Sequence, residues 1–350
     1  MEINKMKGKS RKEFPPNDNS LLLCTPGIIQ SNGYAERIAI FGLLLVFSFF
    51  SFAGNAAAQN HHHIEMFADK PFPEYEYLAY RMVRHEVTDK NGQKTDITSR
   101  YSATAIIPGP TIIMDEGDIA DITLYNQIPN PDKIDLHENV SLHVHGVHYD
   151  IISDGTLKYI NLFQDEGATL VQSYTYRWNA APGTAGTWPY HDHNMSTHNG
   201  AEDKGLFGAL IVNPSSNTAA INQGGNSKAV PLSSIKKDYI LYIMDDTFVG
   251  TEIDSKTGKQ TPVWANPTLS AQTGSNVRFH LIALGTNLHQ FKLPGYSWPD
   301  PGTSNIINEK AMGPLEKHVV VIQAGSNSNY MDTTFAGKAQ NMIGNFNVNP

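Results

Sequence analysis

The sequence predicts an all-β protein with two β-sandwich or barrel domains in tandem, preceded by an N-terminal signal segment. From residue 75 onward, short runs rich in β-branched and aromatic residues are broken by Gly, Pro, Asn and Asp. That pattern is typical of strands and turns, and few stretches keep a helical period. A small polar stretch divides two such blocks, and one long apolar run lies upstream of both. A chain of 350 residues is long enough for two domains, each with its own core.

The apolar run, residues 38–54, follows Arg37 and leads into the alanine run 56–58. This order is typical of a signal peptide, here cleaved near Ala58. The run also reaches the lower end of the length that spans a membrane, so an uncleaved anchor is the alternative. The basic residues near the start favour a cytoplasmic N-terminus. Both interpretations export the rest of the chain to an extracellular or periplasmic location, or to the outer face of the cell membrane.

The composition divides the chain into four parts. Residues 1–58 are an N-terminal extension with the signal peptide or anchor, and residues 59–214 are the first domain. Residues 215–229 (SSNTAAINQGGNSKA) are small and polar with a glycine pair, which indicates a linker. Residues 230–350 are the second domain.

Charge and cysteine content narrow the function classes. The formal net charge is -8, which argues against a nucleic-acid partner. The one cysteine, Cys24, lies upstream of the predicted cleavage point. The exported part therefore has no disulfide, and it lacks the thiolate that a blue copper electron-transfer site needs.

Two His-x-His pairs predict a metal site. His143 and His145 lie in Ser-Leu-His-Val-His-Gly, and His191 and His193 lie in Trp-Pro-Tyr-His-Asp-His. Alternate residues of a strand face the same way, about 6.6 Å apart, so both pairs can point at one cluster. A lone histidine is more often a hydrogen-bonded core residue. Neutral imidazoles without a cysteine suit copper, zinc, iron or nickel, and the order of affinities favours copper.

A further histidine run follows the predicted cleavage point. After cleavage the chain would begin Gln-Asn-His, residues 59–61, with His62 and His63 next. An amine, two amides and a third-position imidazole can hold copper(II) in a square plane. The alternative is a solvated, histidine-rich tail.

Three ordered motifs resemble the first cupredoxin domain of multicopper oxidases. They are Pro-Gly-Pro-Thr-Ile-Ile-Met-Asp-Glu-Gly-Asp at 108–118, His-Val-His-Gly at 143–146, and, within 186–212, Gly-Thr-Trp-Pro-Tyr-His-Asp-His with Gly-Leu-Phe-Gly-Ala-Leu-Ile-Val. The likeness is greatest to two-domain, laccase-like members, which implies two Greek-key cupredoxin domains and copper as cofactor.

The resemblance also implies how the histidines would be used. The first domain would supply half of a trinuclear copper centre, which forms against the second domain of a neighbouring subunit in a trimer. His143 would face the type 2 copper, and His145, His191 and His193 would face the type 3 pair. His148 and His198 match the ligand positions less well.

The second domain departs from the family pattern. Where members read His-x-x-His-x-His-Gly, this chain has His289, the type 1 position, but Lys292 and Pro294 at the two trinuclear positions. The His-Cys-His motif of the family falls on Met-Asp-Thr, residues 331–333. Met342 matches a fold position and not an axial ligand.

Three functions remain open on these grounds. The first is a copper-binding protein that keeps the first-domain half of the trinuclear centre and no type 1 site, with a role in copper capture, buffering or delivery. The second is a laccase-like oxidoreductase that works only with a partner subunit supplying the type 1 copper and the missing histidines. The third is a non-catalytic cell-surface cupredoxin module, because a fold alone does not imply a function.

Overall fold

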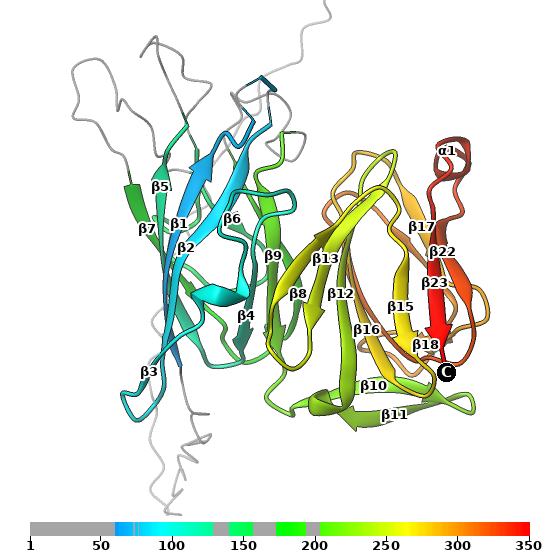
Figure 1. Cartoon of the computed structure of the whole chain (residues 1–350). Helices are drawn as coiled ribbons and strands as arrows, with labels where there is room; N and C mark the ends of the chain where they lie inside the picture. The colour runs from blue at the N-terminus through cyan, green and yellow to red at the C-terminus, as the bar shows by residue number, and fades with distance from the viewer. Residues whose placement is uncertain (1–59, 73, 76, 129–139, 157–172, 194–203) are drawn as a thin grey trace, which may run out of the picture. The chain divides into compact units, whose positions relative to one another are not determined.

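The computed structural model describes the chain in six segments, residues 60–72, 74–75, 77–128, 140–156, 173–193 and 204–350. Regular structure in them is almost entirely β-strand, with a five-residue helix α1 (Phe335–Ala339) and the 3₁₀ turns Thr98–Arg100 and Leu232–Ser234 (Figure 1). The predicted all-β class is confirmed. The predicted signal segment lies outside the described residues, and within them no helix is long and apolar enough to span a membrane.

The first sandwich consists of two mixed sheets. One, called here the β1 sheet, has the order β3 (Lys94–Asp96), β2 (Ala79–Thr88), β1 (His61–Asp69), β5 (Ile119–Asn126) and β7 (Ser173–Asn179). The other, the β8 sheet, has the order β4 (Thr111–Asp115), β9 (Phe207–Asn213), β8 (Gly186–His191) and β6 (His143–Val144). The pairs β1·β5 and β4·β9 are parallel, and the remaining pairs are antiparallel.

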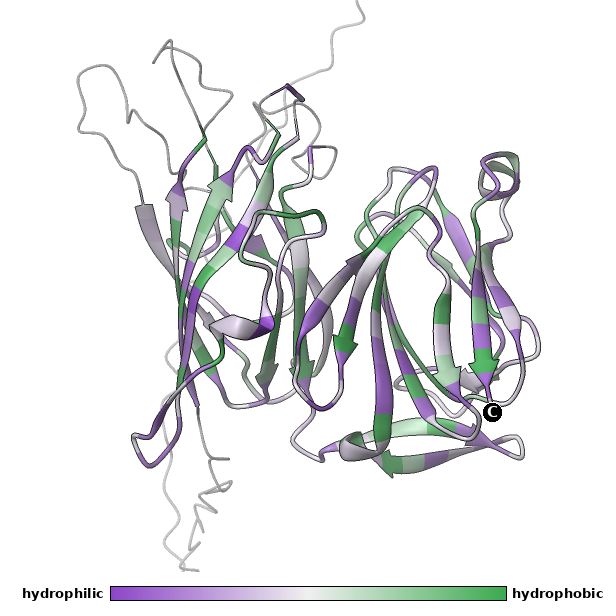
Figure 2. Ribbon diagram, viewed as in Figure 1, coloured by the Kyte–Doolittle hydropathy of each residue, from purple (hydrophilic) through white to green (hydrophobic). Residues whose placement is uncertain are grey.

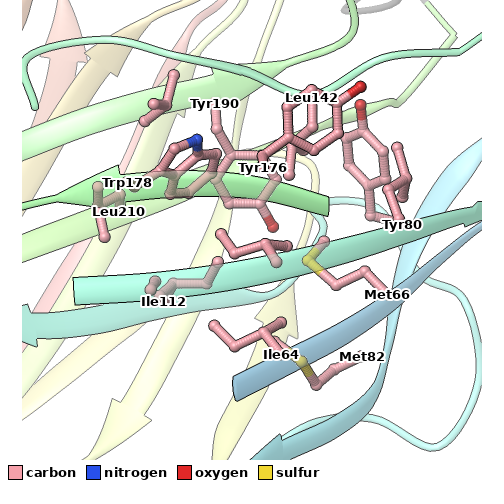
Figure 3. Close-up of a cluster of buried hydrophobic side chains, with 14 of the residues drawn as sticks. Ile64, Met66, Tyr80, Met82, Ile112, Leu142, Tyr176, Trp178, Tyr190 and Leu210 are labelled. Carbon is pink, nitrogen blue, oxygen red and sulfur yellow. The ribbon is translucent and has the colours of Figure 1, made fainter. Parts of the chain in front are cut away.

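The core of the first sandwich lies between these sheets. Along β1 every second residue is buried, as expected for a strand with one face inward, and the strands show alternating hydrophobic and hydrophilic bands (Figure 2). Tyr80, Tyr176, Trp178 and Tyr190 are fully buried together with aliphatic residues of both sheets (Figure 3). Each such ring removes about 150–250 Å² from water, so these aromatics provide much of the apolar burial.

The second sandwich repeats this topology. Its β12 sheet has the order β14 (Gln260–Val263), β13 (Phe248–Asp254), β12 (Ile235–Ile243), β16 (Asn276–Ala283) and β21 (Lys317–Gln323). Its β22 sheet has the order β15 (Leu269–Gln272), β23 (Ile343–Asn349), β22 (Ser328–Asp332), β17 (His289–Lys292) and β20 (Glu309–Met312). A short ribbon pairs β18 (Trp298–Pro299) with β19 (Ile306–Ile307). The parallel pairs recur as β12·β16 and β15·β23, so β6 corresponds to β17 and β8 to β22.

Strand β9 is buried on both faces and connects the two cores. Leu210 lies in the core of the first sandwich, while Phe207 and Ile211 pack in a separate cluster with Ile240 and Tyr242 of β12. The rings of Phe207 and Tyr242 meet edge to face with centroids 4.9 Å apart. Because both faces of β9 are buried, its sequence is almost entirely apolar and does not alternate between apolar and polar residues.

The predicted linker, residues 215–229, lies between the two sandwiches and contains regular structure. Strands Thr218–Gln223 (β10) and Asn226–Pro231 (β11) form an antiparallel hairpin. The Gly224-Gly225 pair between them has φ of 62° and 87°, the geometry of a two-residue hairpin turn. Ile221 is buried against residues of β12 and β21. Small polar residues and paired glycines suit such a turn as well as they suit a linker.

The histidine run at 61–63 is the start of β1, so the alternative of a solvated, histidine-rich tail is wrong. His62 is 4% exposed, and its ring contacts His85 at 2.8 Å and Asp118 at 3.1 Å. The backbone N–H of Asn60 donates to Asp118 at 2.8 Å. The square-planar copper site would need this amide nitrogen as a ligand. In the structure the amide is instead hydrogen-bonded to Asp118.

A buried ionic network connects strands β12 and β16. Asp238 accepts hydrogen bonds from the guanidinium of Arg278 at 3.0 Å and from the ring of His280 at 2.8 Å. Arg278 also reaches Asn213 of the first sandwich at 3.3 Å, and His280 contacts Thr187 of β8. Burial by itself would raise the pKa of Asp238, but the charges of Arg278 and His280 outweigh it and hold that pKa well below its ordinary value. The carboxylate is therefore ionised and paired.

Replacing Asp238 with Asn should lower the free energy of unfolding by about 3–5 kcal/mol, because Arg278 would keep a buried charge without its partner. Urea denaturation followed by tryptophan fluorescence measures the change. The control is Glu252→Gln, which breaks the partly exposed pair with Lys237 and should cost less than about 1 kcal/mol. Equal losses in the two variants would contradict a structural role for the buried network.

Candidate metal centre

The four predicted histidines come together at the ends of two paired strands. His143 in β6 lies directly opposite His191 in β8, and His145 and His193 follow just beyond the ends of these two strands. The ring of His143 lies with its centroid 4.8 Å from that of His145, 5.5 Å from that of His191 and 5.0 Å from that of His193. The antiparallel register thus gathers both His-x-His pairs on one face.

The facing nitrogens of this cluster are close enough to share an ion. Nε2 of His145 and Nε2 of His191 are 3.1 Å apart. Two lone pairs at that distance repel, so a proton or a metal cation must lie between them. One nitrogen from each of His143, His145 and His191 lies within 4.8 Å of the others. Ligand nitrogens of a tetrahedral ion with bonds of about 2.0 Å are about 3.3 Å apart, so small side-chain rotations would close the set.

Backbone carbonyls fix the rings of two of these histidines. Nδ1 of His143 donates to the carbonyl of Asp154 at 2.6 Å, and Nδ1 of His191 donates to the carbonyl of Asp192 at 2.8 Å. Because a carbonyl only accepts, the proton belongs on Nδ1 and the lone pair on Nε2. This is the arrangement that metal-binding histidines commonly adopt. Sequence motifs gave no sign of Asp154, which reaches His143 from a following loop.

Asp192, between the two histidines of the second pair, ties the pairs together. It is 1% exposed, and its Oδ1 accepts the backbone N–H of Ser141 at 2.7 Å and the Ser141 hydroxyl at 3.1 Å. The same hydroxyl accepts the backbone N–H of His193 at 2.9 Å. Asp192 and Ser141 are therefore positioning residues that sequence reasoning missed.

Two glycines allow the close packing around the cluster. Gly146, the last residue of His-Val-His-Gly, has φ of 74°, and a Cβ there would lie 2.0 Å from the ring of Trp188. Gly155 has φ of 83°, and a Cβ there would lie 2.4 Å from the carbonyl oxygen of Leu142. Only glycine fits both requirements without strain, and Gly155 lets the loop bring Asp154 to His143.

Burial favours the neutral form of three of these imidazoles. It lowers the pKa of His145 to about 4 and that of His191 to about 3, and it lowers the pKa of His143 as well. Neutral rings can bind a metal without first losing a proton. His191 is buried and the other three rings are partly exposed, so the cluster is open on one side. His148 is exposed and joins the fold through its backbone pairing with Asn179, while His198 lies outside the described residues.

The second sandwich carries other residues at the equivalent positions. Lys292 of β17 pairs with Met331 of β22 as His143 pairs with His191. The backbone N–H of Gln290 donates to Asp332 at 3.0 Å, as that of Ser141 donates to Asp192. On this register the four histidines of the first sandwich correspond to Lys292, Pro294, Met331 and Thr333.

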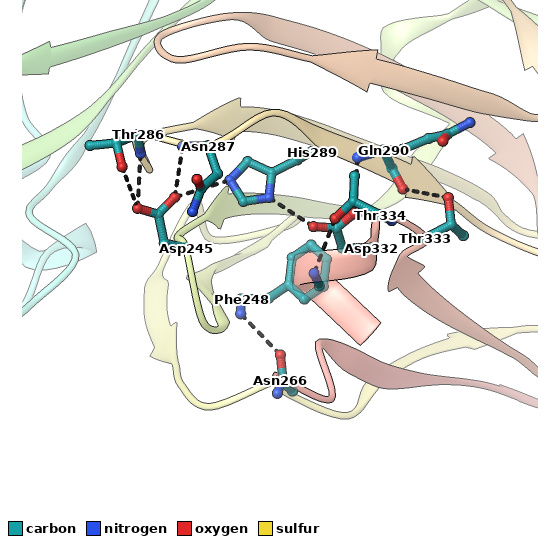
Figure 4. A network of polar contacts seen from close by, with 11 residues as sticks. Asp245, Phe248, Asn266, Thr286, Asn287, His289, Gln290, Asp332, Thr333 and Thr334 are labelled. Carbon is teal, nitrogen blue, oxygen red and sulfur yellow. Dashed lines mark hydrogen bonds and ion pairs between the residues drawn. The ribbon is translucent and has the colours of Figure 1, made fainter. Parts of the chain in front are cut away.

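His289 and Asp332 form a buried pair in the second sandwich. Nδ1 of His289 donates to Asp332 at 2.8 Å, and the two side chains are each 1% exposed. On the other side of the ring, Nε2 lies 3.5 Å from Asp245. Asp245 is itself held by hydrogen bonds from Thr286 and Asn287 (Figure 4). The imidazole is therefore enclosed by carboxylates.

Comparison with known proteins shows sequence similarity to multicopper oxidases. Residues 87–217 match the family model described as multicopper oxidase. A probable nitrite reductase-hydroxylamine oxidoreductase fusion protein of Kuenenia stuttgartiensis is 27% identical over 233 residues, which are 63% of this chain and 24% of that protein. A laccase of Aspergillus fumigatus, abr2, is 34% identical over 112 residues, which are 31% of this chain and 16% of that protein. The chain thus spans a quarter or less of these two relatives.

A solved structure extends the likeness to the whole fold. The crystal structure of a multicopper oxidase covers 83% of this chain and 89% of its own, with a TM-score of 0.51 and 18% sequence identity. Both sandwiches are included in a match of that extent. The chain therefore has the two-domain cupredoxin fold of this multicopper oxidase, and the sequence match to the multicopper oxidase family model lies in its first sandwich and ends just before β10.

Proposed function

We propose that this protein binds copper at His143, His145, His191 and His193 and has no type 1 copper site of its own. The four histidines would form the first-domain half of a trinuclear copper centre. The observation that carries the proposal is the convergence of the four rings across the β6·β8 register, with the rings of His143 and His191 anchored through Nδ1.

The donor set fits copper. It offers neutral imidazole nitrogens on a partly exposed face, and divalent copper has the highest affinity of the first-row ions for such ligands. When bound there, copper would supply either stored metal for delivery or a redox centre. The chain's own contribution is to orient the rings of His143 and His191 through the Asp154 and Asp192 carbonyls and to favour their neutral form through burial.

The second sandwich does not fit a type 1 site, which needs a cysteine thiolate beside its histidines. Asp332 stands at the position of that thiolate and is hydrogen-bonded to His289, the surviving histidine. The carboxylate accepts from Nδ1 of the buried ring, whose Nε2 has no hydrogen-bond partner in the described part of the chain. Cys24, the only cysteine, lies in the N-terminal extension.

The same substitutions argue against oxidase activity by this chain alone. In a trimer built like those of the two-domain family members, Lys292, Met331 and Thr333 would face the four histidines of a neighbouring subunit. An ammonium group beside a bound cation opposes binding through charge repulsion. We therefore favour copper capture, buffering or delivery over electron transfer to oxygen.

A second candidate is a laccase-like oxidoreductase that depends on a partner subunit. It is supported by the intact anchoring of His143 and His191 and by the open side of the cluster, where a partner could contribute further histidines. Oxidase activity that appears only after co-purification from the native source would favour this candidate. A homo-oligomer without activity would favour copper binding alone.

Export of the mature domains is part of the proposal. It is supported by the apolar run 38–54 and the alanine run 56–58. Mass spectrometry of the mature N-terminus distinguishes a cleaved signal peptide from an uncleaved anchor, and recovery of the protein in the cytoplasm would contradict export.

Removing two ligands should remove the copper. We expect the variant with His143→Ala and His193→Ala to bind copper at this site at least about 100-fold more weakly than the unchanged protein, a loss at the upper end of that seen for supporting residues. Metal analysis after dialysis and calorimetric titration measure it. His148→Ala is the matched control, because His148 lies near the cluster but is exposed. Unchanged copper binding in the double variant would refute the site, and a protein that never binds copper would indicate a structural module.

The copper-loaded protein should show no intense blue absorption. This follows because Asp332 and not a thiolate neighbours His289, and the blue colour of type 1 sites requires the copper–thiolate bond. Visible spectroscopy of the isolated, copper-saturated chain measures this absorption. An intense blue band would contradict the absence of a type 1 site.

A further inference from the structure

A second group of metal-ligating side chains lies on the solvent-facing side of the β1 sheet. His61 and His63 alternate along β1 with the buried His62, so their rings share the outer face. Asp121 of the parallel strand β5 lies opposite His63. The two imidazole rings have centroids 4.1 Å apart, and Nε2 of His61 lies 2.8 Å from Oδ2 of Asp121. One ligand atom from each residue lies within 4.8 Å of the other two.

The carboxylate of this group is held in place by a residue of the next strand. Arg177 of β7 reaches both oxygens of Asp121, with Nε 2.7 Å from Oδ1 and Nη2 2.8 Å from Oδ2. A hydrogen bond from a neighbouring residue that orients a carboxylate is a usual companion of a metal ligand. The guanidinium and the carboxylate cancel in charge, so the local field does not by itself repel a cation.

The surrounding charges are balanced as well. Glu86 of β2 lies opposite His63 and is bonded to Arg84 and Lys94. Burial and the neighbouring His61 lower the pKa of His63.

We propose that His61, His63 and Asp121 form a second metal site, which takes a divalent transition-metal ion such as zinc or copper(II). Two imidazole nitrogens and one carboxylate oxygen are a common zinc donor set and also suit copper(II), whereas calcium and magnesium prefer oxygen ligands. A water molecule would complete the coordination, because the side chains of His61 and Asp121 are 37% and 21% exposed. The site belongs to the β1 sheet, while the four-histidine cluster belongs to the β8 sheet, so it does not rest on the proposed function.

The test uses the chain without a histidine tag and follows zinc and copper(II) binding by calorimetry. We expect His63→Ala to remove one equivalent of bound metal from the unchanged protein. It should also abolish the equivalent that remains in the variant with His143→Ala and His193→Ala. Thr123→Ala is the matched control, because Thr123 lies on β5 two positions from Asp121 and should leave the stoichiometry unchanged.

Separate measurements keep this site distinguishable from the four-histidine cluster. Electron paramagnetic resonance of copper(II) in the variant with His143→Ala and His193→Ala should report two nitrogen ligands. Arg177→Gln should weaken that binding by about 10–100-fold through the freed Asp121. The second site would be overturned if the variant with His143→Ala and His193→Ala bound no metal, or if His63→Ala left its metal binding unchanged. Either result is independent of whether the four-histidine cluster binds copper. The competition between zinc and copper(II) then identifies the preferred ion.

Discussion

The register between β6 and β8 is the constraint on which the candidate copper site depends. His143 and His191 are cross-strand neighbours, and the alternation of side chains along each strand then brings His145 and His193 to the same face. A slip of one residue would turn every ring away. The buried carboxylate of Asp192 opposes such a slip because it accepts both the backbone N–H and the hydroxyl of Ser141.

The second sandwich shows how the same framework holds different chemistry. Its Asp332 accepts the backbone N–H of Gln290, the counterpart of Ser141, so the structural role of the aspartate is retained. The imidazole positions are occupied by other residues, and His289 is enclosed between Asp332 and Asp245. The framework hydrogen bonds therefore do not require the histidines, which explains how one sandwich can keep them and the other can lack them.

The two sandwiches are joined into one unit by strands that are buried on both faces. Phe207 and Ile211 of β9 pack against Ile240 and Tyr242 of β12, and the Asp238 network of strands β12 and β16 reaches Asn213 and Thr187 in the first sandwich. The candidate cluster is thus carried by a sheet that is covered on both sides. Such a support gives the four histidines a rigid setting, because the strands next to them cannot move independently of either core.

The sequence by itself determined the all-β class, the two blocks and the pairing of His143 with His145 and of His191 with His193, because period-2 patterns and motif spacing are local properties of the chain. It did not determine that residues 218–231 fold as a hairpin or that the run at 61–63 is a strand, since composition alone does not distinguish a solvated segment from one that finds a partner. Only the tertiary structure brought Asp154 to His143, Asp332 to His289 and Asp121 to the outer face of β1. Each of these contacts joins residues from different strands or loops, and the register of distant segments, which no local pattern records, decides which of them meet.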